Sequence, residues 1–307
     1  MKISKEDKQF EQLVQKIDPQ SRLLRRWKLG DGISTEMMAF EVALPNGQTR
    51  KMIKRGSEHE LHRYKQDSHI EKEFKLLQRL HADGFAVPRP YHFEHASEIF
   101  SGPCLVLEYI EGEMIMVPSD EDDYLLQFAQ QLAKIHQYDG SRVDLSFLPL
   151  QADMISNLMD QFGHSVNKVC TKDILDAIWP IPQHNKSVLV HGDFWFGNVL
   201  WKDGKLVAVL DWEFATLGDP LFDLALARLE TVCQFGRDAM HKFTANYTSI
   251  MNHLDFSTLH YWELWIAFYR ETLFNQFPEW FGDDNAFERI RSRHKWFTNQ
   301  ALEKLSA

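Results

Sequence analysis

The stretch VLVHGDFWFGNVLW, residues 188–201, places a histidine, an aspartate and an asparagine between two apolar runs. Polar side chains at the end of a buried strand cost free energy unless they are paired or take part in chemistry. Asp193 and Asn198 stand in the order Asp-x4-Asn, which is the spacing of the catalytic loop in kinases. The spacing predicts a reaction centre in which Asp193 accepts the proton of a hydroxyl nucleophile.

A further carboxylate follows in the next predicted strand. Asp203-Gly204 stands between two apolar runs, and Asp-Gly in that place predicts a two-residue hairpin turn. In the resulting register Asn198 pairs with Val209, and Asp211 lies roughly 7–8 Å from Asn198. Such oxygen ligands suit Mg²⁺, which takes one or two protein carboxylates and completes its shell with water and phosphate oxygens. The predicted chemistry is phosphoryl transfer, which needs a metal, a base and a cation on the phosphates.

The elements that must position these residues form a β-rich first part and a helical second part. Periodicity and turn residues predict strands over 23–29, 37–44, 51–54 and 104–107 and a helix over 69–81. Glu111-Gly112-Glu113 breaks the pattern, and a helix over 120–138 follows, with Ser119 as its predicted N-cap. Further helices are predicted within 150–180, interrupted near Gly163, and within 224–307.

The composition excludes several classes of protein. The net charge of −10 disfavours general nucleic-acid binding, and no apolar run is long enough for a membrane span. The three cysteines are widely separated and the start of the chain is polar, which together predict a cytoplasmic protein without disulfides. Residues 1–103 carry 18 basic and 15 acidic side chains (+3), and 104–307 carry 16 and 29 (−13). This asymmetry suits an anion in the first part and a cation or metal in the second, although solvated helix faces explain it equally well.

A family resemblance rests on the motifs of the second part. HGDFWFGN is followed thirteen residues later by Asp211-Trp212-Glu213 and then by GDPLFDLA, and this pattern closely resembles the aminoglycoside phosphotransferase and choline kinase-like family. The likeness covers nearly the whole chain and is greatest to kinase-like domains associated with acyl-CoA dehydrogenases. It implies an α+β, protein-kinase-like bilobal fold. The expected parts are a small antiparallel β-sheet lobe (1–107), a hinge (108–112) and a larger, mainly helical lobe (113–307).

The resemblance also implies roles for individual residues. Asp193 is the expected catalytic base, and Asn198 and Asp211 are the expected magnesium ligands. The expected contacts to ATP come from Lys54 paired with Glu73, from Ser34 in the turn Gly30–Ser34, and from the backbone of Glu108 and Ile110 at adenine. His191 is expected to tie down the catalytic loop and Asp223 to brace it. Arg55 stands beside Lys54, and members of the family can use arginine here, so the choice of phosphate cation stays open.

The expected function is an ATP- and Mg²⁺-dependent kinase that phosphorylates a hydroxyl group of a small molecule, with no nucleic-acid or membrane partner. A pseudokinase and a metal-dependent hydrolase built on His191 and Asp193 remain as alternatives, and each polar residue taken alone is more often a cap or turn residue. An acidic second part suits a cationic aminoglycoside or amino alcohol as acceptor. The acyl-CoA-dehydrogenase-associated likeness suggests a hydroxy acid or its thioester instead. The sequence does not choose between these acceptors, between ATP and GTP, or between oligomeric states.

Overall fold

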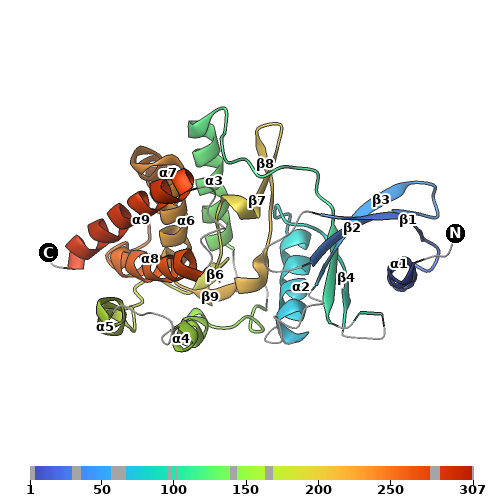
Figure 1. Ribbon diagram of the computed structural model, residues 1–307, viewed down its shortest axis with the longest axis horizontal. Coiled ribbons are helices and arrows are strands. Elements are labelled where there is room, and N and C mark those ends of the chain that lie inside the picture. Colours follow the sequence, from blue (N-terminus) through green and yellow to red (C-terminus); the bar gives the residue numbers. More distant parts are fainter. Residues whose placement is uncertain are drawn as a thin grey trace. The chain divides into compact units, whose positions relative to one another are not determined.

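The computed structural model describes residues 4–29, 36–56, 67–95, 99–100, 102–138, 144–162, 169–276 and 284–305. The chain divides into two compact units (Figure 1), of which the first comprises Met1–Glu113 with Val207–Glu213 and the second Met114–Leu206 with Phe214–Ala307. The small sheet and the larger helical part agree with the predicted α+β class. The predicted phosphate-covering turn Gly30–Ser34 lies outside the described residues.

In the described part of the first unit, five strands form one antiparallel sheet in the order β1-β2-β3-β5-β4. The strands are β1 (Arg22–Lys28), β2 (Glu36–Ala43), β3 (Thr49–Gly56), β4 (Pro90–Glu94) and β5 (Cys104–Glu108), and the helices are α1 (Lys5–Ile17) and α2 (Asp67–Ala82). The turn between β2 and β3 closes with a hydrogen bond from Leu44 N to Gln48 O of 2.8 Å, and Gly47 in it has φ of +80°. Pro45-Asn46-Gly47 therefore forms the predicted turn.

The two faces of β3 meet different surroundings, because successive side chains of a strand point to opposite faces. Lys54 opposes Val106 in register, and Val106 belongs to the apolar core that includes the buried residues of α1. The Lys54 Nζ atom lies 4.3 Å from the centroid of the Phe100 ring of this core. Arg55 points to the other face, where its guanidinium pairs with Glu73 of α2. The side chains of Lys54 and Arg55 therefore lie on opposite faces of the sheet.

Helices make up most of the second unit. They are α3 (Glu121–His136), α4 (Gln151–Phe162), α5 (Val169–Ile178), α6 (Leu221–Phe235), α7 (Arg237–Ile250), α8 (Leu259–Gln276) and α9 (Asp284–Leu305). The central helix is α6, which packs against α7, α8 and α9 and buries nearly every side chain. Asp120 caps α3, because its Oδ1 accepts a hydrogen bond of 3.0 Å from Asp123 N, so the predicted cap Ser119 is wrong by one residue.

The motifs HGDFWFGN and Asp211-Trp212-Glu213 lie in and between short strands and turns. β6 (Val188–Val190) pairs with β9 (Thr216–Gly218), and β7 (Val199–Lys202) pairs with β8 (Lys205–Val209). Two 3₁₀ turns stand beside them, at Phe196–Asn198 and Trp212–Phe214. Asp203 and Gly204 both have positive φ, of 50° and 70°, as a type I′ hairpin turn requires. The predicted Asp203-Gly204 hairpin is confirmed. Among the described residues, no helix is both long enough and apolar enough to cross a membrane.

Candidate active site

The loop after β6 is held by one buried carboxylate. Asp223 of α6 is fully buried, and its two oxygens accept hydrogen bonds from His191 N at 2.7 Å and Gly192 N at 2.9 Å. Gly192 has φ of +85°, and a Cβ atom there would overlap the backbone of Phe214, so the turn needs glycine. The predicted bracing of this loop by Asp223 is confirmed.

Asp223 is itself oriented by a buried histidine. His136 Nε2 lies 3.2 Å from Asp223 Oδ2, and His136 Nδ1 lies 2.6 Å from the Tyr247 hydroxyl. Burial, together with the charges of Asp223 and Asp219, raises the pKa of Tyr247 well above its ordinary value, so Tyr247 keeps its proton. The His136 ring therefore bridges the Asp223 carboxylate and the Tyr247 hydroxyl. This chain fixes the carboxylate that holds the loop.

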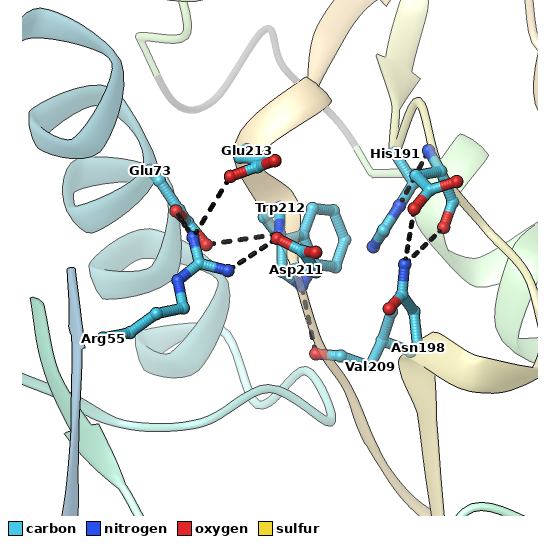
Figure 2. Close-up of polar contacts among 9 residues, drawn as sticks. Arg55, Glu73, His191, Asn198, Val209, Asp211, Trp212 and Glu213 are labelled. Carbon is cyan, nitrogen blue, oxygen red and sulfur yellow. Dashed lines mark hydrogen bonds and ion pairs between the residues drawn. The ribbon is translucent and has the colours of Figure 1, made fainter. Parts of the chain in front are cut away.

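Asp193 and Asn198 are joined directly within the second unit. Asn198 Nδ2 donates to the backbone oxygen of Asp193 and to Asp193 Oδ2, both at 2.9 Å (Figure 2). Asp193 N donates to His191 Nδ1 at 3.2 Å, so His191 ties down the loop as expected. Because both bonds of Asn198 use its amide nitrogen, its Oδ1 keeps its lone pairs and has no hydrogen bond to any described residue.

An arginine surrounded by carboxylates forms the polar centre of the first unit. The Arg55 guanidinium pairs with Glu73, lies 2.5 Å from Asp211 Oδ1 and 3.9 Å from Glu213 Oε2 (Figure 2). Glu73 also accepts a hydrogen bond of 3.3 Å from the backbone nitrogen of Trp212. Burial lowers the pKa of Arg55, but the charges of Glu73, Asp211 and Glu213 outweigh it and raise the pKa overall. Arg55 is therefore a permanent cation.

This geometry corrects one expectation. The residue that pairs with Glu73 is Arg55, not Lys54, because Lys54 points to the opposite face of β3 and its ammonium lies against Phe100. Successive side chains of a strand point to opposite faces of the sheet, so only one of Lys54 and Arg55 can face α2. The sequence alone did not show which one it is.

The expected adenine contacts lie at the last residue of β5 and just beyond it. Glu108 N donates to Arg89 O at 2.8 Å, and Tyr109 N donates to Lys51 O at 3.3 Å. The N–H of Ile110 has no hydrogen bond to any described residue. Ile110 thus offers a backbone donor, whereas the N–H of Glu108 is already used by Arg89 O.

The two expected magnesium ligands belong to different units. Asn198 can offer its Oδ1 to a metal ion. The Oδ1 of Asp211 accepts a hydrogen bond from Arg55, and its Oδ2 has no hydrogen bond to any described residue. These neutral and anionic oxygens fit the donor set that Mg²⁺ prefers. Asp211 also has φ of +61°, a left-handed conformation that costs about 1 kcal/mol for a residue with a side chain. Among the described residues, no group of three or more His, Cys, Asp or Glu side chains is arranged to hold a metal ion.

Two further residues beside the catalytic loop were not predicted. Arg270 of α8 forms an ion pair with Glu230 of α6, and its guanidinium carbon lies 6.0 Å from the centroid of the Trp195 ring. No motif marks Arg270 or Glu230. The available signal was a single arginine at the end of the apolar, largely buried run Leu264–Phe268, since a charge beside such a run needs a partner or a role.

Fold and site together define a kinase-like phosphotransferase. The structure covers 97% of an aminoglycoside 2″-phosphotransferase IIIa solved with GDP and kanamycin, with a TM-score of 0.63 and 17% identity, over 97% of this chain. It also covers 98% of a protein of Ralstonia eutropha assigned to the aminoglycoside phosphotransferases, with a TM-score of 0.69 and 17% identity, over 96% of this chain. At these identities the likeness establishes the fold, and the predicted kinase-like fold is confirmed.

The chain belongs to the phosphotransferase enzyme family, whose model matches residues 45–250. The predicted family and the predicted class of enzyme, a phosphotransferase, are confirmed. Curated relatives are acyl-CoA dehydrogenase family member 10 of Mus musculus, 29% identical over 176 residues, and member 11 of Homo sapiens, 25% identical over 173. These matches span 52% and 51% of this chain but only 16% and 22% of the relatives' own lengths.

Proposed function

We propose that this protein is an ATP- and Mg²⁺-dependent kinase that phosphorylates a hydroxyl group of a small molecule. The observation that carries the proposal is the pair of hydrogen bonds from Asn198 to Asp193, on a loop whose amides are fixed by Asp223. This arrangement holds a carboxylate at a defined position and leaves an amide oxygen for a cation, which suits a base beside a metal.

In the proposed reaction, the acceptor oxygen attacks the γ-phosphorus of ATP as its proton passes to Asp193. The new P–O bond forms as the bond between the γ-phosphorus and the bridging oxygen breaks, and ADP leaves with that electron pair. Asn198 and Asp211 would hold Mg²⁺, which when bound would neutralise charge on the phosphates. Arg55, oriented by Glu73, supplies the cation on the phosphates.

Nucleotide recognition is proposed for the backbone of Ile110 and Glu108 at adenine and for Ser34 at the phosphates. The related structures support the use of a nucleotide and a small-molecule acceptor. One relative was solved with GDP and kanamycin, and an aminoglycoside phosphotransferase APH(4)-Ia was solved with ADP and hygromycin B. The curated relatives are named as acyl-CoA dehydrogenase family members, and on that name we propose a hydroxy acid or its thioester as acceptor rather than an aminoglycoside. A cytoplasmic location, where ATP is available, completes the proposal.

The decisive experiment measures ADP release with ATP and Mg²⁺ over an acceptor panel, in the wild type and in Asp193→Asn. Loss of a general base lowers kcat by about 10²- to 10⁴-fold, while the Kd for ATP stays unchanged because Asp193 does not hold the nucleotide. Asp203→Asn is the matched control, since Asp203 lies in an exposed turn and asparagine tolerates its positive φ.

Two other outcomes would identify a different function. If both proteins bind ATP and neither turns it over, the chain is a nucleotide-binding pseudokinase. If Zn²⁺ or Mn²⁺ raises Tm and ATP with Mg²⁺ does not, the site is that of a metal-dependent hydrolase built on His191 and Asp193.

A further inference from the structure

Arg270 is a largely buried cation that is paired on one side only. Its side chain is 15% exposed and that of its partner Glu230 is 14% exposed. The Nη2 group of Arg270 donates to Glu230 Oε1, and among the described residues no hydrogen-bond acceptor lies at Nε or Nη1. A guanidinium carries five N–H donors in a rigid, planar fork. Arg270 therefore keeps donors for a further acceptor group.

The guanidinium is placed beside the catalytic loop. It lies against Trp195, which stands between Asp193 and Asn198 in the sequence. Burial lowers the pKa of Arg270, and the carboxylates of Glu230 and Asp193 raise it by more, so its pKa is raised overall. Asp193 is thus close enough to act on Arg270 electrostatically, and Arg270 stays charged.

Trp195 has a fixed position in this arrangement. Its indole lies directly over Gly197, at the place that a Cβ atom of residue 197 would occupy. The indole and the guanidinium are therefore neighbours within the second unit, and Trp195 belongs to the loop that carries Asp193.

We infer that Arg270 is a specificity-determining residue that binds an anionic oxygen group of the acceptor, a carboxylate or a phosphate, while the acceptor hydroxyl meets Asp193. This inference rests on the proposed kinase function and extends it to the substrate class. Glu230 orients the guanidinium, and Trp195 supplies an apolar face for the carbon chain between the two polar ends. An acceptor with an ammonium group in that place would be repelled by Arg270.

The test compares acceptors that differ only at the end remote from the reacting hydroxyl. The matched set is γ-hydroxybutyrate, hydroxybutyl phosphate, butanediol and aminobutanol, with longer homologues of each. Initial rates of ADP release give kcat and KM, and calorimetry with Mg²⁺ and a non-hydrolysable ATP analogue gives the Kd of each acceptor. The variants are Arg270→Met, Arg270→Lys and the double variant Arg270→Met/Glu230→Gln, which leaves no buried carboxylate without its partner.

In the wild type, an anionic member has a kcat/KM at least about 10-fold above those of butanediol and aminobutanol. Arg270→Met and the double variant lower kcat/KM for the anionic acceptor by about 10- to 100-fold, mainly through KM, as loss of a charged hydrogen bond requires. The loss for butanediol is smaller, because butanediol carries no charge for Arg270 to bind. Arg270→Lys keeps part of the preference. Whether the carboxylate or the phosphate member loses more identifies the natural group.

Arg237→Met is the control. Arg237 is exposed and lies 4.3 Å from the centroid of the Trp296 ring on another part of the second unit, so its loss leaves the acceptor preference unchanged. The inference is overturned if the wild type prefers aminobutanol or butanediol, if it binds no anionic member, or if Arg270→Met keeps the wild-type preference. Failure of the kinase proposal looks different, because ATP binding or the effect of Asp193→Asn is then missing.

Discussion

Arg55 and Lys54 are adjacent cations of β3 with different tasks in the structure. Arg55 contacts Glu73 and Asp211, whereas Lys54 is buried against Phe100. We expect Arg55→Met to weaken ATP binding by about 10-fold or more, because a charge-assisted contact to phosphate is lost. Arg55→Lys recovers only part of this, since an ammonium lacks the fork that reaches two carboxylates. Calorimetric titration with ATP and Mg²⁺ measures the effect.

Lys54→Met is the matched variant for the same titration. Methionine fills a similar volume in the apolar core, and we expect the Kd for ATP to stay within about 3-fold of the wild type. A large loss of ATP affinity in Lys54→Met, with none in Arg55→Met, would return the phosphate contact to Lys54.

Gly197 is the residue on which the position of Trp195 depends. A Cβ atom at 197 would overlap the six-membered ring of the indole. We expect Gly197→Ala to displace Trp195 and to lower kcat/KM for the acceptor by about 10-fold, with unchanged ATP affinity. If the overlap is the cause, Gly197→Ala has little further effect in a Trp195→Ala background, and a double-mutant cycle measures this coupling. Additive effects of the two substitutions would contradict it.

At the scale of single elements, the β7–β8 hairpin depends on its turn. Gly204 has φ of +70°, and no atom lies within 4 Å of the place that a Cβ atom would occupy, so Gly204→Ala tests the backbone alone. We expect it to lower the free energy of unfolding by about 1 kcal/mol. Asp203→Gly, at the neighbouring positive φ, is the control and is expected to be tolerated. Urea denaturation followed by tryptophan fluorescence compares the two, and equal stability of Gly204→Ala and the wild type would exclude the predicted turn strain.

Helix α9 makes stability depend on pH through His294. His294 is buried, and its Nε2 lies 2.8 Å from Ala267 O of α8. Burial lowers the pKa of His294 below the ordinary value. As the pH falls, His294 is therefore protonated in the unfolded chain before it is protonated in the folded protein. The free energy of unfolding therefore falls as the pH drops below about 6.5. His294→Gln, whose amide still donates to Ala267, is expected to show a weaker dependence, whereas His253→Gln at an exposed position keeps it. Urea titrations at several pH values measure this.

Elements with regular patterns were predictable from the sequence, and two with atypical residues were not. The alternating apolar residues predicted β2 and β3, and Asp203-Gly204 predicted the β7–β8 hairpin. Helix α1 was missed because most of its residues are polar or charged, although Ser4 and Asp7 form a capping box at its start. Strand β4 was missed because it begins with Pro90, whose lack of an N–H is tolerated at the first position of a strand.

The candidate site divides in the same way. Asp193, Asn198 and Asp211 lie in short motifs with turn residues beside them, so their spacing was informative. Arg270 and Glu230 come from two helices far apart in the sequence, and their pairing depends on the packing of α6 against α8. Helix packing is set by many side chains together, and no local pattern reports it.

At the scale of the whole molecule, the first unit is discontinuous in sequence. It takes Val207–Glu213 from a point almost a hundred residues beyond Glu113. Within this unit Val209 N donates a hydrogen bond of 2.7 Å to Ala86 O. Val209 is fully buried, and only 1% of Trp212 is exposed. The same segment brings Asp211 to Arg55. The first unit therefore includes a strand end and a tryptophan that a fragment ending at residue 113 lacks.

We expect a fragment of residues 1–113 to unfold at a lower temperature, and less cooperatively, than the same fragment joined to residues 207–213 by a glycine-serine linker. Loss of a buried tryptophan alone costs about 3–5 kcal/mol, a large part of the stability of a small domain. Thermal unfolding followed by near-ultraviolet circular dichroism compares the two. The linked fragment with Trp212→Ala is the control, and it should lose most of the gain, because the linker without the tryptophan restores little buried surface. Equal melting temperatures of all three fragments would show that the first unit folds without its returning segment.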